Sequence, residues 1–303
     1  MIVMNEVKQE VRHFYNQIGW QLVDEDLYQN ARYEDLRQVS QEYLHRCHLR
    51  VSRYIKPDGR YFLDAGSGPI QYPDYLLYSR GYRYRVCADI SITALREARN
   101  RIGNHGLFVV SDIANLPFKA EIFEGEVSLH TIHHLPKKEH LRAYKELHRV
   151  LAPDCTAAVV NSWSESRMMK LCDPLIRATN RLRGIVKRLI GTPAIITEPA
   201  YRTASDETNT MKEQGKKPPK GTFTARHDVA WIKDEVGTHM PVEIYVWRSV
   251  SVRFTRALIH PSFGGRYWLR LLFWLEDRFP HFFGENGQYP IIFVSKKKEA
   301  PVN

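Results

Sequence analysis

Short apolar runs alternate with amphipathic stretches through the middle of the chain. The apolar runs end at glycine or polar residues, which is typical of buried strands. Stretches with helical periodicity follow the second and the fourth run, at 91–101 and 136–150. Strands that alternate with helices at this spacing predict a parallel sheet covered on both faces, with ligands at the carboxyl ends of the strands. Five runs are predicted as strands: 61–65, 84–88, 107–110, 127–130 and 156–161.

The two ends of the chain complete this pattern. Residues 5–56 carry apolar positions at mixed three- and four-residue spacings, which predicts an N-terminal helical cap. A helix at 227–236, strands at 242–252 and 289–295, and an aromatic-rich helix at 266–283 follow near the C-terminus. We therefore expect an α/β fold with a doubly wound, mostly parallel, seven-stranded sheet.

The stretch after the fifth predicted strand breaks the alternation. Asp173 and Pro174 form a good N-cap and first-turn pair, and the predicted helix that follows them has an apolar side and several Arg and Lys residues. Residues 203–221 have few apolar side chains and are rich in Lys and Pro, which predicts a mobile loop. The sequence thus divides into a helical cap (1–56), an α/β core (57–161), an insertion or lid (162–226) and a C-terminal part of the core with the final antiparallel strands (227–303).

Composition and charge limit the classes of protein to consider. The chain has 303 residues, of which 43% are hydrophobic and 26% charged, as in an ordinary globular protein. A net charge of +10 favours acidic partners, but no RNA-recognition or helix-turn-helix signature accompanies it, so nucleic acid is not favoured. The four cysteines form no C-x-x-C pair. The first residues lack the basic, apolar and small-residue segments that follow one another in a signal peptide. We expect no metal site and a cytoplasmic location.

The candidate chemistry begins where the first predicted strand ends. Residues 62–69 read Phe-Leu-Asp-Ala-Gly-Ser-Gly-Pro, so that Asp64 and Ala65 lead into the loop Gly66-Ser67-Gly68. Glycines allow a close approach of the backbone to a ligand and dihedral angles that other residues avoid. A carboxylate at the strand end can accept hydrogen bonds from an ammonium group or hold the loop in place. A lone glycine loop is weak evidence, because nicotinamide enzymes share it.

Acidic residues at the next two strand ends strengthen this interpretation. Asp89, followed by Ile90, ends the second strand, where a carboxylate can accept from both hydroxyls of a ribose. Asp112 and Ile113 follow the third strand.

These motifs together resemble those of class I S-adenosylmethionine-dependent methyltransferases of the small-molecule kind. The resemblance covers about residues 60–161 and includes 123–135, with His130 at the fourth strand end, and the helix 145–153 that leads into the fifth strand. It implies a Rossmann-like fold and S-adenosylmethionine as cofactor. It assigns the methionine end to Asp64–Gly68, the ribose to Asp89 and Ile90, and the adenine to Asp112 and Ile113, with His130 also beside the cofactor. Ile70 replaces a third glycine and Pro153-Asp154-Cys155 the usual Pro-Gly-Gly, and neither change removes a cofactor contact.

The resemblance leaves the methyl acceptor open. His133 is the candidate general base, because a histidine near the transferred methyl group could accept a proton from a hydroxyl or amine. The large insertion favours a small or amphiphilic acceptor over a polymer. Peripheral membrane contact through the basic and tryptophan-rich helices is not favoured, because their apolar sides are expected to pack on the core. The oligomeric state is not determined.

Two other functions are compatible with parts of this pattern. A nicotinamide-dependent oxidoreductase could use the glycine loop and Asp89, but Gln71 stands where its fingerprint requires a third glycine, and no Tyr-x-x-x-Lys pair occurs. A degenerate methyltransferase fold could act as a binding module. The intact set of Asp64, Gly66, Gly68 and Asp89 disfavours that alternative.

Overall fold

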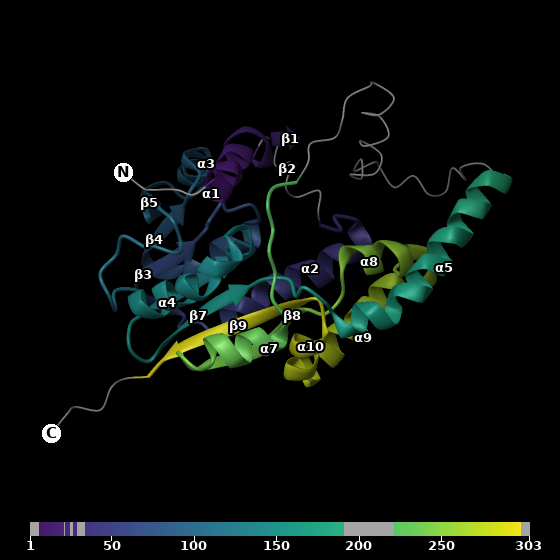
Figure 1. The fold of residues 1–303 in the computed structure, drawn as a ribbon. Helices are drawn as coiled ribbons and strands as arrows, with labels where there is room; N and C mark the ends of the chain where they lie inside the picture. Colours follow the sequence, from purple (N-terminus) through teal and green to yellow (C-terminus); the bar gives the residue numbers. More distant parts are fainter. Residues whose placement is uncertain (1–5, 21, 25–26, 29–33, 191–220, 298–303) are drawn as a thin grey trace.

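A computed structural model describes residues 6–20, 22–24, 27–28, 34–190 and 221–297. A seven-stranded sheet runs through its centre, in the strand order β5-β4-β3-β6-β7-β9-β8 (Figure 1). The strands from β5 to β7 are parallel, and β9 is antiparallel to both of its neighbours. The predicted doubly wound, mostly parallel α/β fold is therefore confirmed. The strands are β3 Asp58–Ala65, β4 Gly81–Asp89, β5 Gly106–Val110, β6 Gly125–Leu129, β7 Cys155–Val160, β8 Val242–Arg248 and β9 Tyr289–Lys296.

Two hydrophobic clusters cover the two faces of this sheet. In β3, Leu63 belongs to the cluster on one face and Phe62 to the cluster on the other, because successive side chains of a strand point in opposite directions. The first cluster includes Leu147 of helix α4, and the second includes Leu95 of helix α3. Helices on both faces leave only the ends of the strands open to a ligand. The main helices beside the sheet are α2 Gln38–Arg50, α3 Ile92–Ile102, α4 His140–Val150, α9 Gly265–Arg278 and α10 Pro280–Asn286.

The N-terminal segment differs from the helical cap that the sequence predicts. It begins with α1 Glu6–Phe14 and a π-helical turn, η1 Tyr15–Gly19, but then forms a two-stranded antiparallel sheet, β1 Leu22–Asp24 and β2 Leu27–Tyr28, before α2. The acidic run at 24–26 interrupts the helical spacing of apolar positions, which explains the break. The division of the chain into four units remains a prediction.

The helix after the fifth strand begins earlier than predicted. Helix α5 spans Arg167–Ile190, so Pro174 lies inside it and Asp173 is not its cap. The hydroxyl of Ser166 accepts from the backbone N–H of Met169 at 3.1 Å and supplies the N-terminal cap instead. The predicted mobile loop at 203–221 lies outside the described residues except for Gly221, so the lid remains a prediction.

Helix caps also correct the C-terminal boundaries. Strand β8 ends at Arg248 and not at residue 252, because Ser251 caps α8 Val252–Leu258 by accepting from the N–H of Phe254 at 3.2 Å. The predicted helix at 266–283 is two helices, α9 and α10, since Pro280 cannot continue the first and begins the second. Near residue 227, a short turn α7 Val229–Trp231 precedes the π-helical η9 Ile232–Val236.

Candidate functional site

A cavity of about 570 Å³ lies at the carboxyl ends of the central strands. Strand β3 lies between β4 and β6, so the order of the sheet reverses there, which is where doubly wound folds bind ligands. Helix α1 covers the cavity from one side, and residues 221–226 border it from another. Every residue predicted to bind the cofactor lines this cavity except Ala65, which is buried in the strand behind it.

The glycine loop approaches the cavity in a conformation that requires glycine. Gly66 has φ +77°, and a Cβ there would lie 2.1 Å from the side chain of Thr131. Gly68 has φ +54°, and a Cβ there would lie 2.9 Å from the ring of Trp20. Both the left-handed backbone and the close neighbours exclude a side chain. The loop can therefore present backbone to a ligand with no side chain between them.

Asp64, at the end of β3 before this loop, forms a buried ion pair with Arg85 of β4 that the sequence did not predict. Its Oδ2 accepts from Nε of Arg85 at 3.1 Å and also from an Nη of the same guanidinium. Arg85 is fully buried, and its Nη1 donates to the backbone carbonyl of Tyr75 at 2.5 Å. The ion pair ties the end of β3 to β4, and the contact of Asp64 with the methionine end of the cofactor stays a prediction. An arginine inside an otherwise apolar strand was the signal that could have revealed the pair.

Asp89 joins the glycine loop to the start of α3. Its Oδ2 accepts from the N–H of Gly68 at 2.8 Å, and its Oδ1 accepts from the N–H of Ser91 at 2.8 Å. Burial raises the pKa of this carboxyl to about 6, although the N–H groups of Ser91 and Gly68 act in the opposite direction. Each carboxylate oxygen can accept a further bond, so Asp89 can still bind a ribose hydroxyl.

Asp112 is buried against helix α1. Its Oδ1 accepts from the N–H of Ala114 at 3.0 Å, and its Oδ2 accepts from Nζ of Lys8, which also pairs with Glu139. The sequence did not predict Lys8, and a single cation beside Val11 on the buried side of a helix was the available signal. Asp112 thus anchors the N-terminal helix over the cavity.

Ser111 and Ile113 flank this carboxylate. The buried hydroxyl of Ser111 has no hydrogen-bond partner among the residues that the structure describes, and the side chain of Ile113 is buried in the same cavity wall. A buried orphan hydroxyl beside an apolar side chain fits the polar edge and the flat face of an adenine ring. Ile113 therefore fits the adenine that the resemblance assigns to it, and Ser111 adds a polar group that the sequence did not predict.

Three histidines also line the cavity. His130 has φ +56°, and its Nε2 is buried without a partner in the described part of the chain. His133 lies 3.1 Å from Oδ1 of Asn161 through its Nδ1. His134 bridges the hydroxyl of Tyr15 and the carbonyl of Phe223, each at 2.8 Å.

All three imidazoles are neutral at physiological pH. Burial lowers the pKa of His130 and of His134 to about 4, and it lowers the pKa of His133 well below its usual range. With Asn161 accepting from Nδ1–H of His133, the lone pair of that ring is on Nε2. His133 is thus a proton acceptor, and a weak one.

Glu34 and several tyrosines, none of which the sequence predicted, also line the cavity. Arg248 is buried and pairs with Glu34, which lines the cavity 214 residues away along the chain. The guanidinium of Arg248 lies 4.5 Å from the ring centroid of Tyr289. Tyr72 and Tyr75 add phenol groups to the same wall. No local pattern could have joined Glu34 to Arg248, because only the folded sheet brings them together.

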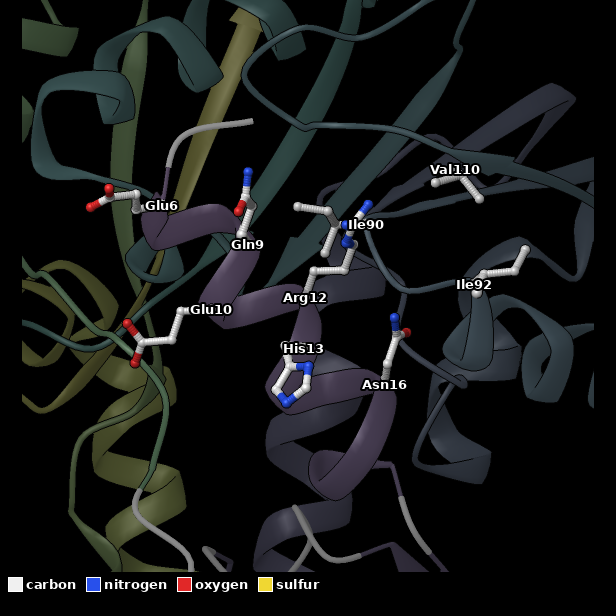
Figure 2. A pocket seen from close by; sticks show the side chains of 9 residues that line it. All are labelled: Glu6, Gln9, Glu10, Arg12, His13, Asn16, Ile90, Ile92 and Val110. Atoms are coloured by element: carbon white, nitrogen blue, oxygen red, sulfur yellow. The ribbon is translucent and has the colours of Figure 1, made fainter. Parts of the chain in front are cut away.

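A separate groove of about 610 Å³ lies on the outer side of α1. Figure 2 shows polar side chains of that helix, such as Glu10 and Arg12, on one side and Ile92 and Val110 on the other. Of the predicted site residues, only Ile90 borders it. The groove therefore does not contain the candidate chemistry.

Comparison with known proteins agrees with this geometry. Residues 63–159 match the family model described as a methyltransferase domain. Within these residues the chain contains a methyltransferase domain, on the predicted Rossmann-like fold. This match supports S-adenosylmethionine, the predicted cofactor. No curated protein sequence matches the chain.

Two solved structures illustrate how far the likeness of this methyltransferase domain extends. The [4+2]-cyclase SpnF is 16% identical, with a TM-score of 0.51 over 96% of this chain and 97% of that one. Haemonchus contortus phosphoethanolamine N-methyltransferase 2, in complex with S-adenosyl-L-methionine, is 12% identical, with a TM-score of 0.51 over 98% of this chain and 61% of that one. At these identities the likeness shows the fold alone.

Proposed function

We propose that the chain binds S-adenosylmethionine in the 570 Å³ cavity and transfers its methyl group to a small or amphiphilic acceptor. The observation that carries this proposal is that two sets of residues line one cavity. The glycine loop, Asp89 and the residues at 111–113 form the set that we assign to the donor, and the histidines, Glu34 and the tyrosines form the set that we assign to the acceptor. A donor and an acceptor that must meet in line need such adjoining sites.

The set of residues assigned to the donor would hold the cofactor as follows. Backbone at Gly66 and Gly68 would face the methionine portion, Asp89 the ribose hydroxyls, and Ser111 with Ile113 the adenine. S-adenosylmethionine supplies an activated methyl group on a sulfonium, so that the protein needs to supply orientation and a site without water. Helix α1, anchored by Lys8 on Asp112, would exclude water from the bound cofactor.

The set of residues assigned to the acceptor would orient it and accept its proton. Nε2 of His133 carries the lone pair because Asn161 fixes the tautomer, and His130 offers a second unprotonated ring nearby, with 6.3 Å between the two ring centroids. A weak base of this kind suits an acceptor that loses its proton only as the methyl group arrives. The aromatic walls favour a substrate with apolar surface.

Two experiments test this function. Calorimetry should show binding of S-adenosylmethionine and S-adenosylhomocysteine and no binding of NADH; tight binding of NADH would favour the oxidoreductase alternative. Methyl-labelled cofactor, incubated with fractionated small molecules and lipids, should then pass its label to one fraction. Cofactor binding without transfer to any fraction would favour a binding module or another reaction, which matters because SpnF is named a cyclase on this fold.

The variant His133→Gln distinguishes the proposed role in proton transfer from a role in binding the cofactor. We expect it to lower turnover of the acceptor found by at least about 100-fold, the lower end of the usual contribution of a general base, and to leave the affinity for S-adenosylhomocysteine unchanged. An equal loss of both quantities would show that His133 supports the cavity and has no role in proton transfer.

A further inference from the structure

Helix α9 exposes an aromatic stripe to solvent. Tyr267, Trp268 and Trp274 are 73%, 62% and 60% exposed. Together with exposed Leu271 they follow a spacing of three and four residues, so they form one side of the helix. Its other side, with Leu269 and Phe273, is buried in the protein. The expectation that this helix packs its apolar residues on the core therefore holds for only half of them.

Helix α5 exposes a second apolar stripe. Leu171 is 83% exposed, and Leu175, Leu182 and Ile185 are exposed at spacings of three, four and seven residues from one another. Figure 1 shows the distal half of α5 extending away from the sheet and the helices around it. Seven residues of this helix are Lys or Arg, and one, Asp173, is acidic. A strongly basic helix with an exposed apolar stripe is typical of proteins that lie on a membrane surface.

The two stripes belong to one end of the molecule. Met169 of α5 and Leu272 of α9 pack against the same hydrophobic cluster, and Phe254 of α8 lies between them in sequence and joins that cluster too. In Figure 1, these helices gather at the end of the sheet away from β5. We call the exposed side chains of α5 and α9 the C-terminal surface.

Charge decides which partner this surface fits. Exposed Arg266 and Arg278 border the tryptophans on α9, and exposed Arg181 and Arg188 lie beside the apolar stripe of α5. Tryptophan and tyrosine rings favour the headgroup layer of a bilayer, and arginine pairs with lipid phosphates and anionic headgroups. Among the described residues, no helix is both long enough and apolar enough to cross a membrane, so contact would be peripheral.

We propose that the C-terminal surface binds the face of a bilayer that contains anionic lipid. Apolar side chains of both helices enter the headgroup layer, and the arginines contact the lipid charge. Loss of contact between water and several aromatic rings favours this binding, and charge attraction adds to it. The proposal does not depend on methyl transfer.

Cosedimentation with vesicles tests the proposal. The full chain should bind vesicles of phosphatidylcholine with phosphatidylserine and should not bind phosphatidylcholine alone, and added salt should weaken binding through screening. The variant Arg181→Glu/Arg188→Glu should bind about 30-fold more weakly or worse, from the loss of two favourable charges. Trp268→Ser/Trp274→Ser should lose binding at low and high salt alike.

A matched control has the same change of charge elsewhere. Arg96 and Arg99 are exposed on α3, so Arg96→Glu/Arg99→Glu should bind vesicles as the parent does. Every variant should keep the circular dichroism spectrum of the parent. Failure of the parent to bind anionic vesicles, or an equal loss in the α3 control, would overturn the proposal. Self-association that the tryptophan variant abolishes, without vesicle binding, would assign the surface to a second copy of the chain.

Discussion

Asp89 combines a buried carboxylate with a pKa of about 6, close to physiological pH. The ribose hydroxyls would donate to its charged form, so protonation should weaken cofactor binding. We expect affinity for S-adenosylhomocysteine to be constant above about pH 7 and to fall as the pH drops through about 6. Calorimetry in overlapping buffers measures this change.

A substitution identifies the group responsible. Asp89→Asn cannot titrate, so it should bind weakly and without this pH dependence, and Asp89→Ala should lose about 2 to 4 kcal/mol of binding free energy, the equivalent of two charge-assisted hydrogen bonds. A parent whose affinity does not change between pH 5 and 8, or an Asp89→Asn variant with the same pH profile, would contradict the assignment of Asp89 to the ribose.

Glu126 does not line the cavity, but its burial affects the stability of the folded protein. It is fully buried in β6, neither carboxylate oxygen has a partner among the described residues, and burial raises its pKa well above the usual range. The folded protein therefore favours the protonated acid, and the stability that this acid contributes is lost as the pH rises through its raised pKa. Glu126→Gln should increase the free energy of unfolding at pH 8 by more than about 1 kcal/mol, with little change near pH 4.

Glu124 is the matched control, two residues away. Its carboxylate accepts from the N–H of Arg60 and from Lys56, and its pKa is lowered. Its contribution is present at neutral pH and is lost as the pH falls, so Glu124→Gln should decrease stability at pH 8. Urea denaturation at both pH values compares the variants. A Glu126→Gln variant that is less stable at pH 8 would show that the carboxylate is charged and solvated.

At the scale of elements, the loop after β3 and the loop after β6 fit together at Gly66. Gly66→Ala would add a Cβ 2.1 to 2.6 Å from three side-chain atoms of Thr131 in a left-handed conformation. We expect this variant to lose cofactor binding measurable by calorimetry and to lower the melting temperature. Gly103→Ala is the control, because Gly103 has φ +50° but no atom within 4 Å of its Cβ position. It should lower stability through the backbone alone, because φ +50° with ψ −129° is a conformation that favours glycine, and it should bind cofactor normally.

Helix α1 is held over the cavity by one buried cation. Lys8→Met would leave Asp112 and Glu139 without it, and removal of one member of a buried pair costs about 3 to 5 kcal/mol. Helix α1 should then exchange its amide hydrogens faster and be cut sooner by protease, whereas β3 and β4 should stay protected. Lys8→Met/Asp112→Asn/Glu139→Gln removes the unpaired charges and should restore part of the protection. Unchanged exchange in α1 of the single variant would show that its apolar contacts suffice to hold it.

Across the whole molecule, the order of the sheet explains why the site could be predicted in part. The strand ends that carry Asp64, Asp89 and His130 are neighbours in the order β4-β3-β6, so residues that the chain separates by up to 66 positions meet at one edge. Local motifs revealed these residues because each follows a short buried strand. Arg85, the partner of Asp64, and Lys8, the partner of Asp112, were missed because each acts through a contact across elements.

The sequence by itself determined the alternation of strands and helices, the glycine loop and the acidic residues at strand ends, because each depends on neighbours within a few positions. Only the tertiary structure decided the pairing of Glu34 with Arg248 and the neutral state of the histidines, since both depend on burial among residues far apart in the chain. It also decided which apolar residues stay in water: periodicity shows that α9 has apolar residues at helical spacing, but only packing selects Phe273 for the interior and leaves Trp268 exposed.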